Sequence, residues 1–599
     1  MERARKVILG LAVIVLAWGL MVMLTGGIDA RLGGLVIRSR DPFRAIVSGL
    51  ALLLLHAFLS PASWRRAADR GASLLAIAAP AVAAACALLL SMHAVKNGAF
   101  VAGGADAFGY VSQAYGWARG TLPGPEPLPI SVPWPSGDAS LAPLGYRIGP
   151  EPHTIVPTYA PGLPLIMAAA TFIAGGCGPY LVVPLCAGLV VWLTFRLGRL
   201  AGGVSTGLLA AIFVTISPIV VFQALWPMSD IPAAALWTGA TLAALADKRR
   251  GAVASGLWAA AGLLVRPNLP VVPFVLLAHL AFSSRGRERW IRVALFCGAV
   301  APAVIGIAAL NTAWYGAPWN SGYGSAAELY SAGNIVPNLA RYPVWLWHTQ
   351  SPLVLLAVMP FVPRFRADAS ARAVRLCAAL FLATLGCYLV YSPFEEWWYL
   401  RFLLPAIPAL LVLMSTGLVA LGRRVPAPWG RPAVAAVTIF LLGHAMRFNQ
   451  QQGMFGPVKD GESRYADVGV YIRDTLPPNA IVFSVQQSGS VRYYGGRQTI
   501  RWDLIDRDWT ARAAAEVERL GLHPYMVIED FELPQMRDWF GLAPEAPAPW
   551  PLVARMREPV GVSVLDLSSR PAIGVIPAAL APGAAPRCAA LQPLTMQRR

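Results

Sequence analysis

Long runs of apolar residues recur along most of the chain and constrain its fold more than any other feature. A helix needs about 20 consecutive apolar residues to cross a hydrocarbon layer roughly 30 Å thick, and such runs recur between residues 7 and 448. Of the 599 residues, 56% are hydrophobic and only 13% are charged, which is typical of membrane proteins. We therefore expect a mainly α-helical, polytopic bundle.

The formal net charge of +18 comes from arginine-rich clusters that separate the apolar runs. Such clusters mark cytoplasmic loops, whereas a nucleic-acid-binding protein gathers its charge on one face, so we expect no nucleic-acid partner. With the clusters inside, about 13 spans place the N-terminus in the cytoplasm and the C-terminus outside. The predicted spans are 7–24, 45–60, 72–93, 179–195, 204–225, 231–247, 251–265, 268–283, 291–310, 351–363, 373–391, 402–421 and 432–448.

Three segments on the external side interrupt this pattern. The apolar stretch 159–174 would reverse the sidedness of every later cluster if it crossed the membrane, and its Pro161, Gly162 and Pro164 suit a re-entrant or juxtamembrane segment. The long loops 94–158 and 311–350 are expected to enclose a site.

Hydropathy falls after residue 448. Strand-like runs at 481–485 and 525–529 alternate with helical patterns, which predicts a small extracytoplasmic α/β domain over 449–570. The Ala- and Pro-rich end, 571–599, is typical of a disordered tail. Six cysteines lie in or beside apolar spans and only Cys588 lies in the polar part, so we expect no internal disulfide framework there.

Two carboxylates lie at external ends of predicted spans. Asp106 follows Gly103 and Gly104 in the first long loop, and Asp230 follows Ser229 where the next span begins. Acids so placed can converge from separate loops on one site. Each can instead cap a helix, and capping and catalysis are compatible.

Arg266 is bounded by apolar residues on both sides at the external end of a span. A charge in that position is costly and suggests function. Its guanidinium offers two parallel hydrogen bonds to a phosphate or pyrophosphate. Snorkelling of the side chain to the interface is the alternative.

Aromatic residues surround further polar groups on the external face. The segment 391–411 contains Glu395, Glu396 and Trp398, which fit either an interfacial aromatic belt or contacts to a sugar. Tyr315 and Tyr323 lie in a Gly-rich loop that could close over a cavity. His153 could carry a proton, although a single histidine is equally an ordinary surface residue.

Taken in order, these motifs resemble the GT-C glycosyltransferases. They are an Asp in the first external loop, Y-A-P-G-L-P-L at 159–165, M-S-D-I-P at 228–232, R-P-N at 266–268 and R-F-L-L-P-A-I-P at 401–408. The resemblance covers residues 1–448 and is greatest to bacterial relatives of the aminoarabinose transferase and the protein O-mannosyltransferases. It implies a sugar donor linked to a polyprenyl or dolichyl phosphate and a site facing away from the cytoplasm.

The resemblance also implies roles for individual residues. Asp106 matches the catalytic acid of the first loop, Asp230 the acid of the second, and Arg266 a basic residue near the lipid phosphate. Donor-binding candidates are Arg266, Arg401, Tyr110, His153 and Tyr159; sugar- or acceptor-binding candidates are Glu395, Glu396, Trp398, Tyr315 and Tyr323. Many relatives have two adjacent acids in the first loop, whereas alanines flank Asp106 here. Whether Asp106 and Asp230 hold a divalent cation, Mg²⁺ or Mn²⁺, therefore stays open.

The expected function is inverting transfer of a hexose or pentose from a polyprenyl-phosphate donor to a lipid, glycan or protein of the cell envelope. The expected location is the bacterial inner membrane. A transporter or flippase of lipid-linked glycans is an alternative, which should show two related halves around a midplane site. A noncatalytic scaffold is another, and it predicts that Asp106 and Asp230 are dispensable.

Overall fold

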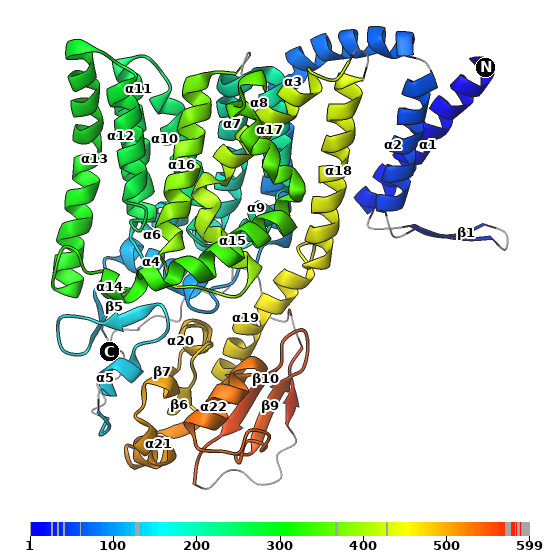
Figure 1. Cartoon of the computed structure of the whole chain (residues 1–599). Helices are drawn as coiled ribbons and strands as arrows, with labels where there is room; N and C mark the ends of the chain where they lie inside the picture. The colour runs from blue at the N-terminus through cyan, green and yellow to red at the C-terminus, as the bar shows by residue number, and fades with distance from the viewer. Residues whose placement is uncertain are drawn as a thin grey trace.

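The computed structural model describes residues 2–25, 28–32, 35–39, 42–59, 61–125, 132–135, 137–365, 369–426, 429–569 and 577–581, with Gly583 and Cys588. Helices fill most of the chain, and a small sheet region follows near the C-terminus (Figure 1). The predicted class, mainly α with a small α/β region, is confirmed to that extent. Most of the tail predicted to be disordered, 571–599, lies outside the described residues.

The first helices flank a hairpin. α1 (Glu2–Thr25) and α2 (Pro42–Leu59) are joined through β1 (Ile28–Leu32) and β2 (Leu35–Ser39), which pair antiparallel. These elements stand at one side of the bundle in Figure 1, and α3 (Pro61–Asn97) leads from them into it.

Most of the remaining helices form the membrane-type bundle. Their bounds are α6 (Gly162–Ala174), α7 (Gly178–Gly202), α8 (Val204–Ile216), α9 (Pro218–Gln223), α10 (Asp230–Ala244), α11 (Arg249–Val265), α12 (Val271–Phe282), α13 (Gly286–Tyr315), η3 (Pro352–Phe361), η4 (Pro363–Phe365), α16 (Ala371–Leu389), η5 (Trp397–Ala406), α17 (Ile407–Gly422) and α18 (Gly430–Gln451).

Within the described ranges, five helical segments are long and apolar enough to cross a membrane: Ala76–Asn97, Gly162–Gly202, Gly286–Tyr315, Ala371–Leu389 and Trp397–Gly422. Four shorter apolar helices accompany them. Helical structure lies over every predicted span, but the count of about 13 stays a prediction. The stretch 159–174 contains α6, which runs through the 3₁₀ turn η1 (Gly175–Cys177) into α7; its re-entrant placement also stays a prediction.

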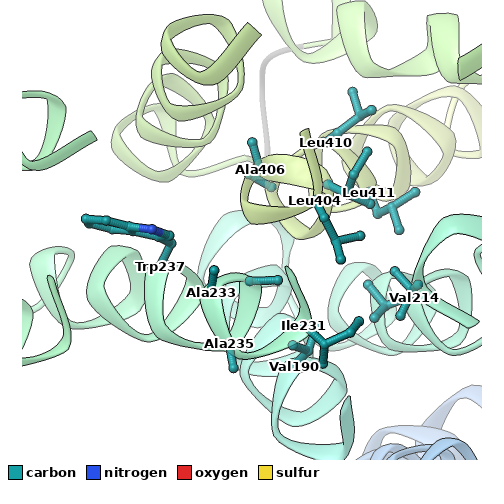
Figure 2. Packing of buried hydrophobic residues seen from close by; sticks show 14 of the residues in the cluster. Val190, Val214, Ile231, Ala233, Ala235, Trp237, Leu404, Ala406, Leu410 and Leu411 are labelled. Carbon is teal, nitrogen blue, oxygen red and sulfur yellow. The ribbon is translucent and has the colours of Figure 1, made fainter. Parts of the chain in front are cut away.

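The centre of the bundle is the segment η5–α17. In its most apolar window, 94% of residues are buried by neighbouring helices. Figure 2 shows Leu404 pointing toward the α10 residues Ile231 and Ala233, with which it shares the core of the bundle. Small side chains such as Ala233 let helices approach closely, which drives packing where lipid removes the hydrophobic effect.

The two long segments predicted to be external, here named the first and second external segments, are structured, which corrects their description as loops. Residues 94–158 contain α4 (Asp106–Arg119), α5 (Gly137–Leu141) and a sheet of order β3-β5-β4, formed by β3 (Gly124–Pro125), β4 (Tyr146–Ile148) and β5 (Thr154–Pro157). Residues 311–350 contain α14 (Ala326–Leu329), η2 (Ala332–Asn334) and α15 (Ile335–Gln350). α15 has no uninterrupted apolar run, because Asn338, Arg341 and Pro343 break it, so hydropathy alone does not reveal it.

The C-terminal region is built on a six-stranded sheet of order β11-β9-β10-β8-β6-β7. β6, β7 and β8 are parallel, whereas β10 is antiparallel to both β8 and β9. The strands are β6 (Ala480–Phe483), β7 (Gln498–Ile500), β8 (His523–Glu529), β9 (Leu552–Met556), β10 (Val562–Asp566) and β11 (Ala578–Ala579). The helical elements are α19 (Pro457–Thr475), α20 (Ser488–Gly495), η6 (Trp502–Leu504), α21 (Arg507–Arg519), η7 (Asp530–Glu532) and α22 (Leu533–Trp539).

Both faces of this sheet are covered. Ile481 and Phe483 pack in one core and Val482 in the other, as expected when successive side chains point to opposite faces. Trp134 and Leu141, from the first external segment, belong to the core with Ile481. The C-terminal domain and that external segment therefore share a hydrophobic core.

Candidate active site

Asp106 is the meeting point of three separate segments. It opens α4 after Gly104, whose φ of +57° glycine adopts without steric cost. Its Oδ1 accepts a hydrogen bond from the Tyr159 hydroxyl at 2.7 Å, and its Oδ2 accepts one from Arg401 Nη1 at 2.8 Å. These partners are 53 and 295 positions away in sequence. The carboxylate is thus fixed by tertiary contacts.

Asp230 and Arg266 form a second, more deeply buried pair. Arg266 Nη1 donates to Asp230 Oδ1 at 2.5 Å, and only 9% and 3% of the two side chains are exposed. Arg266 ends α11 in an extended conformation, because the next residue, Pro267, disfavours helical geometry there. Asp230 opens α10, so this pair joins the end of one helix to the start of another.

One aromatic ring links the two pairs. The guanidinium carbons of Arg266 and Arg401 each lie 5.5 Å from the Phe402 ring centroid, which places both in cation–π range. The Tyr388 ring stacks on Phe402 with centroids 5.0 Å apart. Phe402 is adjacent to Arg401 in sequence, but Tyr388 lies inside a predicted span and no sequence pattern marks it. Two acids, two arginines and these rings make one cluster.

The helix-cap alternatives do not describe these acids. Residues 105 and 229 occupy the cap positions of α4 and α10, and no side chain caps either helix. The Asp106 and Asp230 carboxylates bond to other segments, although their place in the first turn still suits the helix dipole. The snorkelling alternative for Arg266 also fails, because its side chain is buried against Asp230.

The electrostatics of Asp106 favour an ionised acid. Burial raises the pKa of the Asp106 carboxyl, but the Arg401 guanidinium and the hydrogen bond from Tyr159 outweigh it, so the net pKa lies below the ordinary value. Arg401 Nε is buried and has no partner within the described residues. The cluster thus contains an ionised carboxylate that can accept a proton, beside a guanidinium N–H group that is available for a hydrogen bond.

Three tyrosines line the approach to Asp106. The Tyr110 and Tyr159 ring centroids are 4.6 Å apart, and the Tyr323 ring meets Tyr159 edge-on at 5.9 Å. Tyr110 donates a hydrogen bond to Ser229 Oγ at 2.8 Å, next to Asp230. Tyr315 instead donates to the Pro157 carbonyl and so fixes the start of its loop. Tyr110, Tyr159 and Tyr323 are therefore brought together, and Tyr315 lies beside them.

The other predicted residues lie apart from the acids. His153 is exposed in the turn between β4 and β5, and no hydrogen bond joins it to the cluster in the described part of the chain. Glu395 is 88% exposed and pairs with Arg341 at 3.4 Å. Glu396 is also exposed, and Trp398 stacks near Phe222. These side chains are close to Arg401 in sequence but do not enter the site. η5 turns Arg401 inward, whereas the beginning of η5 lies at the surface.

The acids do not form a group that suits a metal ion. Among the described residues, no three His, Cys, Asp or Glu side chains gather in a metal-binding arrangement. Asp106 and Asp230, the predicted ligands, each bond to an arginine. A cation held by both acids would compete with the two guanidinium groups for their carboxylate oxygens, and a divalent cation here stays a prediction.

The C-terminal domain packs directly against the segment that carries Asp106. The backbone N–H of Ala102 donates to the Tyr494 hydroxyl at 2.7 Å. Gly103 lies so close to the Tyr465 ring that an added Cβ would overlap it, and Gly489 is equally close to Phe108 of α4. The position of Asp106 therefore depends on contacts with α19 and α20.

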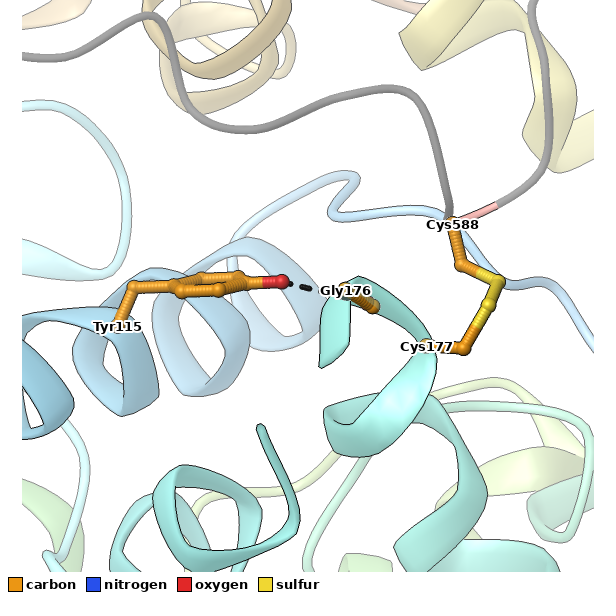
Figure 3. The surroundings of a disulfide bond; sticks show 4 residues. All are labelled: Tyr115, Gly176, Cys177 and Cys588. Carbon is orange, nitrogen blue, oxygen red and sulfur yellow. Dashed lines mark hydrogen bonds between the residues drawn. A yellow bond between two sulfur atoms is a disulfide. The ribbon is translucent and has the colours of Figure 1, made fainter. Parts of the chain in front are cut away.

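A disulfide joins Cys588 to the helical bundle, a link that the cysteine positions alone do not indicate. Cys177 and Cys588, 411 positions apart, are bonded (Figure 3). Cys177 lies in the turn η1 between α6 and α7 rather than inside a span, so it is accessible to the tail. The Tyr115 hydroxyl of α4 donates to the neighbouring Gly176 carbonyl at 3.2 Å. The bond thus holds Cys588 near the helix that carries Asp106.

Sequence comparisons give no assignment: no family model matches the chain, and no curated protein matches it significantly. Solved structures do resemble it. ArnT from Cupriavidus metallidurans in the apo state aligns at a TM-score of 0.50 and 14% identity, over 83% of this chain and 98% of ArnT. The oligosaccharyltransferase of Archaeoglobus fulgidus aligns at 0.50 and 11%, over 83% of this chain and 75% of that enzyme. The chain has the GT-C fold.

The structural likeness covers more of the chain than the sequence resemblance does. A match over 83% of the 599 residues cannot fit within residues 1–448, so it includes part of the C-terminal domain. A second ArnT structure contains undecaprenyl phosphate, and an oligosaccharyltransferase structure holds an inhibitory peptide with dolichol phosphate. At these identities the likeness establishes the GT-C fold, and activity must be argued from the site.

Proposed function

We propose that this chain is a membrane glycosyltransferase that moves a sugar from a polyprenyl-phosphate donor to an acceptor on the extracytoplasmic face. The observation that carries the proposal is the Asp106–Arg401 pair beside the Asp230–Arg266 pair within a GT-C fold. A carboxylate and two cations in one cluster supply the groups that displacement of a phosphate requires. ArnT, which shares the fold, binds undecaprenyl phosphate.

Asp106 acts as the base in this proposal. It accepts the proton of the acceptor's nucleophilic O–H group while that oxygen attacks the anomeric carbon of the sugar. The bond between the anomeric carbon and the phosphate oxygen breaks, its electron pair leaves with the lipid phosphate, and the anomeric configuration inverts. The phosphate leaves as an anion, so no strong general acid is needed. The lowered pKa of Asp106 keeps it ionised near neutral pH.

Arg401 and Arg266 stabilise the lipid phosphate. In the free protein each guanidinium is held by a carboxylate, so its position is set before the donor arrives. Arg401 Nε is available for a phosphate oxygen, and charge-assisted hydrogen bonds of this kind are the strong ones. Phe402, in contact with both guanidinium groups, fixes their spacing. No metal ion is assigned a step in this mechanism.

The sidedness of the site rests on the disulfide. Disulfides persist in oxidising compartments outside the cytoplasm, and Cys177 lies next to α4. This supports the site and the C-terminal domain on the extracytoplasmic face. We propose a bacterial inner membrane with the N-terminus in the cytoplasm, as the arginine clusters of the sequence suggest.

The decisive experiment measures transfer of radiolabelled sugar from a panel of polyprenyl-phosphate donors in membranes containing the full chain. Asp106→Asn is expected to abolish transfer at matched levels of folded protein. Asp247→Asn is the matched control, because Asp247 also pairs with an arginine, at 2.6 Å, but is 61% exposed near the other end of α10. Equal activity of Asp106→Asn and the wild type refutes the assignment of the base. A wild type that reacts with no donor favours the transporter or the scaffold.

A further inference from the structure

A cavity of about 640 Å³ lies beside the first external segment, within the size range of about 300–1,000 Å³ that small-molecule sites usually have. Three parts of the chain enclose it: the first external segment, the loop after α13 and the C-terminal domain. Their lining residues are Ala139, Ala142, Tyr146, Arg147, Ile148, Trp314, Tyr315, Asn320, Ser321, Gly324, Ser325, Arg501 and Leu504. Asp106 is not among them.

The lining has the chemistry of an anionic, hydroxyl-bearing ligand. It contains two arginines, Arg147 and Arg501, and no carboxylate. Arg147 is exposed and makes no ion pair within the described residues, whereas Arg501 is held by Asp503 at 2.5 Å. Tyr146 and Trp314 are largely buried and contribute only small parts of their rings to the lining. An arginine held by a carboxylate and one without an ion pair suit the anionic group of a phosphorylated or carboxylated sugar.

One loop connects this cavity to the acid cluster. Tyr315 and Gly324 line the cavity, while Tyr323, between them, packs against Tyr159. Tyr159 donates the hydrogen bond to Asp106. Gly322 approaches the Thr158 backbone too closely to carry a side chain, which holds the loop against Tyr159. The loop that bounds the cavity therefore also contacts the tyrosine that donates a hydrogen bond to Asp106.

We propose that this cavity binds the acceptor and that the acceptor carries an anionic group beside its hydroxyls. The identification of the ligand as an acceptor rests on the proposed glycosyltransferase function. Arg147 holds the anionic group from the membrane domain, and Arg501 holds it from the C-terminal domain. This gives the C-terminal domain a role in substrate binding that its sequence does not indicate.

Binding of glucose 6-phosphate and of glucose to the full chain in phosphatidylcholine nanodiscs tests the cavity directly. The phosphorylated sugar is expected to bind at least about tenfold more tightly, since each charge-assisted hydrogen bond is worth that much. Arg147→Gln and Arg501→Gln should each remove most of this preference, and Arg147→Lys should retain part of it. Arg507→Gln is the control, because Arg507 belongs to the same domain and is 57% exposed outside the cavity.

Equal affinity for the two sugars, or an unchanged preference in Arg147→Gln, would overturn the cavity assignment. Nanodiscs that also contain phosphatidylinositol identify the source of the ligand. If this lipid weakens glucose 6-phosphate binding in the wild type and not in Arg147→Gln, the cavity takes a membrane headgroup. If it has no effect, the cavity takes a free anionic glycan.

Asp106→Asn separates this proposal from the proposed function. It should bind glucose 6-phosphate like the wild type while transferring no sugar. Where transfer is observed, glucose 6-phosphate should inhibit the wild type and not Arg147→Gln, and inhibition that is identical in both would refute the acceptor role. If no donor reacts but binding depends on Arg147, the anionic-sugar site stands and the transferase function fails.

Discussion

Two aspartate–arginine pairs associated with α10 have nearly the same bond length and opposite surroundings. Asp230 and Arg266, at its start, are 2.5 Å apart, with side chains 3% and 9% exposed. Asp247 and Arg372, beyond its end, are 2.6 Å apart and 61% and 48% exposed. The difference shows that burial, not bond length, separates a structural or catalytic ion pair from a solvated one.

The physical reason lies in solvation. Water solvates both partners of the exposed pair, so breaking the bond costs little. Removing one partner of a buried pair leaves an uncompensated charge away from water, which is strongly destabilising. The Asp106–Arg401 pair is intermediate, with side chains 26% and 19% exposed, as expected of a pair that must meet a substrate.

After the loss of Asp106 itself, the largest effect on transfer is expected for Arg401→Gln. Loss of one preorganised charged donor should reduce transfer by roughly 10²–10³-fold. Arg341→Gln, which breaks the pair with the 88% exposed Glu395, should leave transfer unchanged. Because Arg401 lowers the pKa of Asp106, its removal raises that pKa, and the acid limb of the pH–rate profile should move to higher pH. An unshifted limb with reduced activity would show that Asp106 is not the titrating base.

Arg266→Met should be the most destabilising change. It leaves Asp230 buried without its cation, for which we expect a loss of about 3–5 kcal/mol in unfolding free energy. Arg372→Met at the exposed pair should cost no more than about 1 kcal/mol. Unfolding in detergent measures both. Similar losses in the two variants would contradict the distinction between the pairs.

Gly489→Ala tests whether the C-terminal domain positions α4. An added methyl group overlaps the Phe108 ring, and overpacking of this kind costs about 1–3 kcal/mol. Transfer should fall with it, because α4 carries Asp106. Gly461→Ala in α19 is the matched control, since its Cβ would meet only Pro559 at an ordinary 3.8 Å. Equal activity of both variants would show that the contact only supports the fold.

The smallest effect concerns Glu532, a buried acid bonded to two backbone N–H groups. Burial raises its pKa to about 7. The folded state then binds more protons than the unfolded state between an ordinary carboxyl pKa and about 7, so the stability of the C-terminal domain should decrease as pH rises through this window. Glu532→Gln should flatten that dependence, measured by unfolding at pH 5 and pH 8. An unchanged slope would assign it to another group.

The comparison also explains which parts of the site the sequence predicts. Asp106, Asp230 and Arg266 are predicted because polar groups at the ends of apolar runs are rare and costly. Arg401 is marked by its motif, but its pairing with Asp106 is not. Glu395 and His153 are also ionisable residues predicted for the site, but they lie outside the cluster. Residue type alone does not reveal which way a segment turns. Tyr388 and Phe402 are hidden among the apolar residues of predicted spans.

The sequence by itself determines that this is a helical membrane protein with polar groups gathered at span ends and a small α/β region after them. Hydropathy and charge are local properties, and local properties can be read along a chain. Only the tertiary structure decides that Asp106 pairs with Arg401, that Cys177 joins Cys588, and that Arg147 and Arg501 share a cavity. Those partners lie hundreds of residues apart, and only packing of the whole chain brings them together.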